Sequence, residues 1–174
     1  MISRITNEQF NENIDQFNEL LIDNLHWNTS NNDIMIKNNY VKKLPIGNKV
    51  YSHTSLEVKG IRLDFTISYH DLYNVPIINV RLYKDHKLIL SLLETRDILK
   101  IGSAVTSLNT HHLLQDTWVQ IHPCETLQQL ETHSKSIGLK CQVNPIVEYL
   151  CCWFGVYGLS SIFPQITFRP TLYR

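Results

Sequence analysis

The sequence of 174 residues has no excess of charge of either sign. Sixteen Lys and Arg residues balance sixteen Asp and Glu residues, which gives a formal net charge of +0 at pH 7. Proteins that bind nucleic acid or anionic membranes through a general electrostatic field carry a surplus of basic residues. The balanced composition argues against both classes, and we expect partners to be recognised through local surfaces.

Cysteine is also scarce. The four cysteines show no pairing pattern, and they are Cys124, Cys141, Cys151 and Cys152. Small domains that depend on disulfides have a higher density of cysteine in regular spacings. A disulfide framework is therefore excluded as the organising principle, and we expect thiols in a reducing compartment.

Long hydrophobic runs are absent as well. The most membrane-like stretch covers residues 147–163, but it contains Glu148 and lies between Pro145 and Pro164. A bilayer core requires about 20 apolar residues, so a buried core helix is the better interpretation. The first eight residues become polar and acidic too early for a signal peptide. We expect a cytoplasmic protein.

The length fits one domain, because one hydrophobic core commonly serves about 100 to 200 residues. Repeats, low-complexity tracts and linkers are missing, so residues 1–174 are expected to form a single domain. Thr6 and Gln9 form a capping-box pattern at the start of a helix. Apolar residues then recur at helical spacing, at Phe10, Ile14, Phe17 and Leu21. Residues 28–33, rich in Asn and Ser, interrupt this helix.

After the predicted helix, the hydrophobic pattern of the sequence changes to a period of two, which is typical of strands. The most regular strand pattern covers residues 61–69, where apolar and polar residues alternate. Residues 77–83 and 88–93 are two further strand-like runs, separated by a loop of hairpin length. Weaker strands are indicated at 34–36 and 40–44. The sequence therefore predicts an antiparallel meander of about four strands, which is a usual sheet size.

The second half of the chain alternates between irregular and regular patterns. Residues 95–116 are interpreted mostly as loop, although residues 97–99 could start a short helix, and residues 117–121 form a short strand. A helix is predicted at 125–135, and a buried one follows Asn144 and Pro145 and ends at Pro164. The order of helix, sheet, active loop and helices indicates an α+β domain.

One motif carries reactive chemistry. His122-Pro123-Cys124 stands where the predicted strand gives way to a predicted helix. The N-terminus of a helix lowers the pKa of a thiol, and His122 would add positive charge. A free cysteine is also common as a small buried hydrophobe. A zinc site is disfavoured, because no two-plus-two ligand spacing appears.

The order of several motifs resembles the autophagy branch of the ubiquitin-conjugating, E2-like enzymes, in which a His-Pro-Cys triplet holds the thioester-forming cysteine. The matching pieces are Leu72-Tyr73-Asn74-Val75-Pro76, Leu108-Asn109-Thr110-His111-His112, His122-Pro123-Cys124-Glu125-Thr126 and the pair Trp153-Phe154. The compact chain lacks room for the large insertion of the lipid-conjugating member of this branch. The resemblance implies a conjugating-enzyme-like fold, with an N-terminal helix, an antiparallel meander and C-terminal helices.

The same resemblance implies an activity and its partners. Cys124 would accept a ubiquitin-like modifier, autophagy-related protein twelve, from an activating enzyme that resembles autophagy-related protein seven. A lysine of autophagy-related protein five would then attack the thioester. No metal, nucleotide or organic cofactor is expected, because nucleotide use belongs to the activating enzyme.

The sequence departs from conventional conjugating enzymes at the oxyanion donor. These enzymes carry His-Pro-Asn before the cysteine, whereas here the cysteine itself follows His122-Pro123. Asn109 is the candidate donor, with the role of a turn residue as the alternative. Tyr73 is the candidate to orient Asn109 or the incoming lysine.

Two other functions are kept open. A small cysteine hydrolase would cleave modifier adducts, but no evident relay of Cys, His and Asp or Asn supports it. An inactive, conjugating-enzyme-like binding module would not need a cysteine at the junction of strand and helix.

Overall fold

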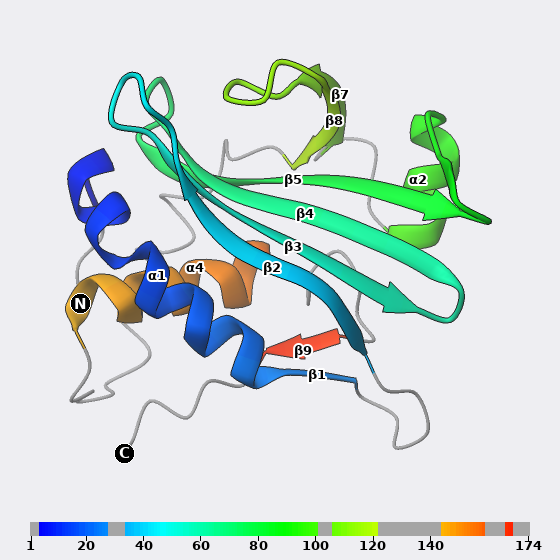
Figure 1. Cartoon of the computed structure of the whole chain (residues 1–174), viewed down its shortest axis with the longest axis horizontal. Coiled ribbons are helices and arrows are strands. Elements are labelled where there is room, and N and C mark those ends of the chain that lie inside the picture. Colours follow the sequence, from blue (N-terminus) through cyan, green and yellow to red (C-terminus); the bar gives the residue numbers. More distant parts are fainter. Residues whose placement is uncertain (1–3, 28–33, 101–105, 122–143, 159–165, 169–174) are drawn as a thin grey trace.

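The computed structural model describes residues 4–27, 34–100, 106–121, 144–158 and 166–168. The elements in chain order are α1 (Asn7–Asn24), β1 (Leu25–Trp27), β2 (Met35–Lys43), β3 (Val50–Val58), β4 (Ile61–His70), β5 (Val75–Lys84), β6 (Lys87–Leu88), α2 (Leu92–Leu99), β7 (Thr106–Thr110), β8 (Thr117–Ile121), α4 (Pro145–Tyr157) and β9 (Ile166–Phe168). Figure 1 shows α1 and α4 together on one side of a twisted sheet, with the β7–β8 hairpin curled over the other side. This is the α+β architecture expected from the sequence.

The central sheet is a meander with an added hairpin. Strands β2, β3, β4 and β5 are consecutive antiparallel neighbours, and β8 and β7 follow beyond β5, so the seven-stranded sheet has the order β2-β3-β4-β5-β8-β7, with β6 paired to β5. A separate two-stranded sheet joins β1 to β9. The four-stranded meander is confirmed, and the sheet is larger than the sequence indicates.

The hydrophobic core lies between the sheet and the two long helices. Apolar side chains of β3, β4, β5 and β8 face α1 and α4 and form one cluster with them. Phe154 of α4 contacts both Phe17 of α1, at 5.9 Å between ring centroids, and Phe65 of β4, at 6.3 Å. We call the opposite side of the sheet, away from α1 and α4, the outer face.

Both long helices begin where the sequence predicts. The Thr6 side chain accepts the N–H of Gln9, and Gln9 Oε1 accepts the N–H of Thr6, so the capping box is formed. Asn144 caps α4 and also donates a hydrogen bond to Asn13 Oδ1 at 2.6 Å, which ties the start of α4 to α1. The described part of the stretch interpreted as a core helix is mostly buried, as expected, but α4 ends at Tyr157, earlier than Pro164. Among the described residues, no helix is long and apolar enough to cross a membrane.

Two predictions for residues 88–116 are wrong. The run 88–93 is not a strand, because only Lys87–Leu88 pairs with β5 and a helix, α2, begins at Leu92. The Ser91 side chain accepts the N–H of Glu94 and caps this helix, which outweighs the apolar strand-like pattern. Residues 97–99 end α2 rather than starting a helix, and residues 106–110 are strand β7 rather than loop.

The first part of the sheet also differs from expectation. The two weak strands at 34–36 and 40–44 are one strand, β2, with an irregular register between Ile36 and Asn38. Strand β3 was not predicted, because Ser52 and Thr54 occupy positions on its core side and hide the alternation. The helix predicted at 125–135 lies outside the described residues.

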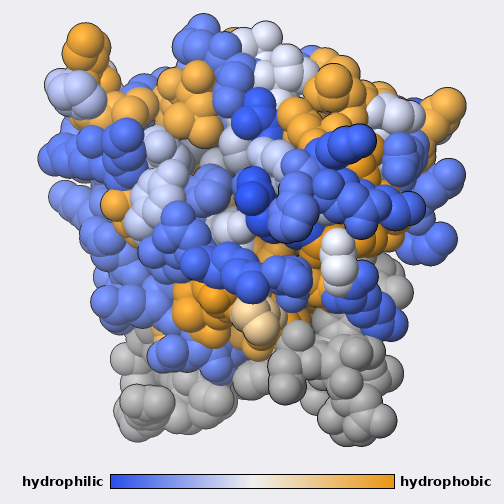
Figure 2. Space-filling model, turned by 45° about the vertical axis from the view of Figure 1, so that its right-hand side comes forward, coloured by the Kyte–Doolittle hydropathy of each residue, from blue (hydrophilic) through white to orange (hydrophobic). Residues whose placement is uncertain are grey.

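The surface is mixed in character. Figure 2 shows hydrophobic residues in separate patches among hydrophilic ones on one face of the molecule. The large apolar side chains that remain exposed include Leu72 and Ile46 in turns of the sheet and Leu93 on α2.

Candidate active site

Asn109 lies on β7, at the edge of the sheet, and pairs with Trp118 of β8. Its Nδ2 donates hydrogen bonds to Ser107 Oγ at 2.8 Å and to Gln120 Oε1 at 2.9 Å. The bond to Gln120 shows that the amide leans along the hairpin toward the C-terminal end of β8. The predicted oxyanion donor therefore has both N–H groups engaged by neighbours.

Strand β8 is directed toward the β4–β5 turn (residues 71–74). It runs antiparallel to β5 and pairs with it at two positions, one of which is Asn79 with Gln120. At its last residue, Ile121, the strand is heading toward the start of β5 and the turn before it. His122 and Cys124 follow directly, and both lie outside the described residues.

Tyr73 lies in this β4–β5 turn. The N–H of Asn74 donates to the carbonyl oxygen of His70 at 2.8 Å, and Asn74 has a left-handed backbone with φ 55. Asn adopts this conformation more readily than most residues, which explains its place here. Tyr73 is 38% exposed, and its ring centroid lies 4.7 Å from that of His70. The role expected of Tyr73 stays a prediction.

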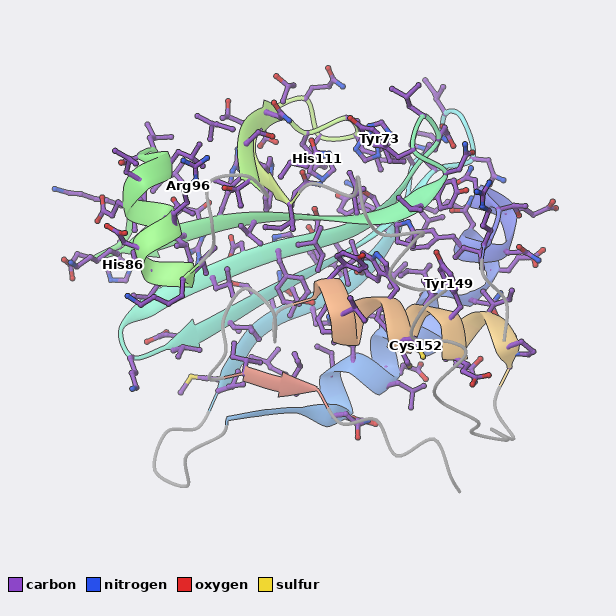
Figure 3. All side chains as sticks on the ribbon, turned by 180° about the vertical axis from the view of Figure 1, so that it is seen from behind. Tyr73, His86, Arg96, His111, Tyr149 and Cys152 are labelled. Carbon is purple, nitrogen blue, oxygen red and sulfur yellow. The ribbon has the colours of Figure 1, made fainter. Side chains whose placement is uncertain are left out.

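A chain of ring contacts connects Tyr73 with the hairpin tip (residues 111–116). The ring of His70 lies 4.9 Å from that of His112, which is stacked on His111 at 5.2 Å. His111 in turn contacts Trp118 at 5.6 Å. Figure 3 shows Tyr73 and His111 on the same side of the sheet, away from α4. Two segments that match the family pattern are thus brought together.

Hydrogen bonds fix His111 as a neutral ring of known tautomer. Its Nδ1 accepts the backbone N–H groups of Leu113 and Leu114 at 3.1 Å and 3.2 Å. A nitrogen that accepts carries no proton, so the proton is on Nε2, which lies 2.8 Å from Thr66 Oγ1 and donates to it. The ring therefore holds the tip turn together and fastens it to β4.

The electrostatics of the tip favour neutral imidazoles. Burial, followed by the neighbouring His112, lowers the pKa of His111 to about 4, against a smaller effect of Asp116. Burial also lowers the pKa of His112 to about 4, followed by the effect of His70. The pKa of His70 is lowered chiefly by burial. These rings are hydrogen-bonding and packing groups at neutral pH rather than cations.

The start of β8, beside the hairpin tip, is held by a cation above an indole. The guanidinium carbon of Arg81 lies 4.4 Å from the ring centroid of Trp118, and Arg81 Nε donates to the carbonyl oxygen of Thr117 at 2.7 Å. Asp116 joins both partners, with an ion pair to Arg81 at 2.9 Å and a bond from Trp118 Nε1 at 2.6 Å. Such contacts fix the direction in which β8 leaves the hairpin.

The two cysteines that the structure describes lie away from the β7–β8 hairpin. Cys151 and Cys152 are on α4, where Cys151 is buried and Cys152 is half-buried. Figure 3 shows Cys152 on the helix side of the sheet, away from Tyr73 and His111. In the part of the chain that the structure describes, no three His, Cys, Asp or Glu side chains converge as metal ligands.

Sequence reasoning missed two residues of this region, Gln120 and Asn79. They are polar residues within strands β8 and β5. The two residues are paired with each other on the outer face of the sheet. The signal available was a polar residue at alternate positions of otherwise apolar runs, which also fits an ordinary solvent-facing strand. Their burial becomes visible only in the folded structure, where β5 and β8 pair.

Comparison with known proteins decides the family. Residues 9–167 match the family model described as autophagocytosis associated protein, active-site domain. The ubiquitin-like-conjugating enzyme ATG10 of Candida albicans is 47% identical over 169 residues, which cover 97% of this chain and 94% of that protein. The chain belongs to this family of E2-like conjugating enzymes.

Solved structures agree with this fold. The solution structures of KmAtg10 match with a TM-score of 0.51 and 23% identity, over 91% of this chain and 94% of that chain. The crystal structure of the autophagic E2 Atg10 matches with a TM-score of 0.52 and 15% identity, over 91% and 97%. The enzyme thus has the conjugating-enzyme-like architecture, and it acts in ubiquitin-like conjugation in autophagy.

Proposed function

We propose that the enzyme carries a ubiquitin-like modifier, autophagy-related protein twelve, as a thioester on Cys124 and transfers it to a lysine of autophagy-related protein five. The modifier comes from an activating enzyme that resembles autophagy-related protein seven. The direction of β8 carries this proposal, because the strand ends at Ile121 while heading toward the exposed Tyr73 turn. An exposed turn ahead of the last residue of β8 supports a nucleophile in the sequence that follows this strand.

The chemistry requires a thiolate and an oxyanion donor. The Cys124 thiolate attacks the thioester on the activating enzyme, and the lysine amine later attacks the new thioester on Cys124. Each attack passes through a tetrahedral oxyanion, for which one hydrogen-bond donor contributes about a hundredfold or more in rate. We assign Asn109 as this donor and Tyr73 as the residue that orients it or the lysine, while His122 favours the thiolate.

No resident cofactor enters this reaction. A lysine amine needs no strong base where a partly dry site lowers its pKa. We also place the enzyme in the cytoplasm and treat residues 1–174 as one domain, which the single core cluster of α1, the sheet and α4 supports.

Transfer chemistry is tested by trapping the thioester. The purified enzyme is incubated with activating enzyme, modifier and ATP, and the products are compared on reducing and non-reducing gels. We expect an adduct that thiols remove, and Cys124→Ser should abolish it or leave a stabler oxyester. Cys152→Ser, a change at a half-buried position of α4, is the matched control and should load normally.

Three results would contradict the assignment. Loss of the adduct from folded Cys152→Ser with retention in Cys124→Ser would move the site. Cleavage of a preformed modifier adduct without transfer would indicate a hydrolase, and absence of any adduct would indicate a binding module.

A further inference from the structure

Polar side chains of the β7–β8 hairpin and of the neighbouring strands β5 and β4 form a ladder across the four strands. Register pairs Thr66 of β4 with Asn79 of β5, Asn79 with Gln120 of β8, and Gln120 with Ser107 of β7. Directly paired residues share one face of a sheet. The neighbouring positions on these strands, such as Phe65, face the core, so the ladder lies on the outer face beside Asn109.

One amide in this ladder lacks a partner. Asn79 is 2% exposed, and its Nδ2 has no hydrogen-bond acceptor among the described residues. A buried donor without an acceptor costs the desolvation of its N–H groups. The residue opposite, Gln120, has a carbonyl oxygen, but that oxygen accepts from Asn109 Nδ2 at 2.9 Å. That oxygen has a second lone pair, but in the described arrangement Asn79 Nδ2 does not donate to it.

A change of partners would give the Asn79 N–H an acceptor. Asn109 can stabilise an oxyanion only by redirecting one N–H, because its Nδ2 donates to both Ser107 Oγ and Gln120 Oε1. If the bond to Gln120 is released, Gln120 Oε1 becomes an orphaned acceptor. Asn79 Nδ2 lies directly across the ladder and can then donate to it, because side chains of paired residues come within hydrogen-bonding reach.

We propose that Gln120 is a positioning residue that holds the Asn109 amide near the end of β8 and releases one N–H to the oxyanion, while Asn79 takes over the vacated acceptor. The inference rests on the proposed function, and specifically on Asn109 as the oxyanion donor. The transition state then gains a hydrogen bond between Asn79 and Gln120 that is absent from the described arrangement. This hydrogen bond lowers the barrier to transfer without strengthening the binding of the modifier.

The test separates stability from rate. Asn79→Leu removes a donor that is unpartnered at rest, so its midpoint of urea denaturation should equal or exceed that of the wild type. Discharge of preloaded Cys124 thioester in single turnover should nevertheless slow about three- to tenfold, the effect of one neutral hydrogen bond. Ser52→Ala is the matched control, because Ser52 Oγ is also buried and unpartnered but lies on the core side of β3, and it should discharge at the wild-type rate.

A double-mutant cycle shows whether Asn79 acts through Asn109. In an Asn109→Ala background, Asn79→Leu should cause no further slowing. Gln120→Met is the second variant, which keeps length but removes the acceptor, and it should slow discharge only while Asn109 is present.

The outcomes distinguish the inference from the proposal beneath it. If Asn109→Ala slows discharge but Asn79→Leu discharges at the wild-type rate, the exchange between Asn79 and Gln120 is wrong, while the role of Asn109 as oxyanion donor still holds. Equal slowing by Asn79→Leu in the wild-type and Asn109→Ala backgrounds also overturns the proposed exchange between Asn79 and Gln120. If Asn109→Ala discharges at the wild-type rate, Asn109 is not the oxyanion donor, and the exchange that depends on it is refuted as well.

Discussion

Replacing His111 should change how the stability of the enzyme depends on pH. The ring is 1% exposed, its Nδ1 accepts two backbone N–H groups, and its Nε2 donates to Thr66. The two bonds that Nδ1 accepts require the neutral form, whereas the bond that Nε2 donates is compatible with either form. Burial is the main reason that the pKa of His111 falls to about 4.

The sign of the effect follows from proton binding. An unfolded histidine has a pKa of about 6.5, so between pH 6.5 and pH 4 the unfolded state binds more protons than the folded state. The stabilising contribution of neutral His111 is complete above pH 6.5 and is lost as the pH falls toward 4. Between pH 7 and pH 5 the loss amounts to about 2 kcal/mol for this residue.

The assay compares His111→Asn with the wild type by urea denaturation at pH 7 and pH 5. Asn retains an oxygen that can accept the N–H groups of the tip turn but has no titrating ring. The free energy by which the wild type exceeds His111→Asn should shrink by about 2 kcal/mol at pH 5. Gly155→Ala, which involves no titrating group, is the control, and its difference from the wild type should stay constant between the two pH values. An unchanged difference for His111→Asn at the two pH values would refute the reasoning.

The remaining predictions concern the site and α4. Asn109→Ala should leave folding and loading of the modifier intact and slow single-turnover discharge by about ten- to a thousandfold; discharge at the wild-type rate would return Asn109 to the role of an ordinary hairpin residue. Tyr73→Phe, at an exposed turn position, should slow discharge less, and a larger effect than that of Asn109→Ala would assign the donor role to its hydroxyl. Gly158→Ala should lower the free energy of unfolding, because a Cβ there would lie 2.2 Å from the Phe154 carbonyl oxygen. Gly155→Ala meets nothing within 4 Å and should raise the free energy of unfolding by up to about 1 kcal/mol, so equal stability of the two variants would contradict this account.

Sequence patterns predicted the elements whose signals are local. The capping box at Thr6, the cap and proline at Asn144 and Pro145, and the alternation of residues 61–69 each depend on neighbours in the chain. The structure confirms all three. The patterns failed for 88–93, where the cap at Ser91 decided between helix and strand.

Predictions also failed where strands bury polar side chains. Ser52, Thr54 and Ser55 are buried on β3, and alternation of hydrophobicity cannot reveal such a strand. Ser55 donates to Asp64 Oδ1 at 2.6 Å, a contact that only the register of β3 and β4 creates. The same reason kept Asn79 out of the predicted site residues, since the residues paired with it in register, Thr66 and Gln120, lie on other strands.

Natural sequences depart from local rules mainly at functional sites, where the cost is offset elsewhere in the fold. Asn79 fits this pattern, because an unpartnered buried N–H lowers stability by about 1 to 3 kcal/mol. A cost that is present at rest and relieved in the transition state speeds the reaction, whereas a bond already formed at rest would not. The proposed exchange at Gln120 therefore gives a physical reason for an amide that packing alone would replace with leucine. If Asn79→Leu proves both more stable and slower in discharge, the stability lost at this position is the consequence of its use in transfer.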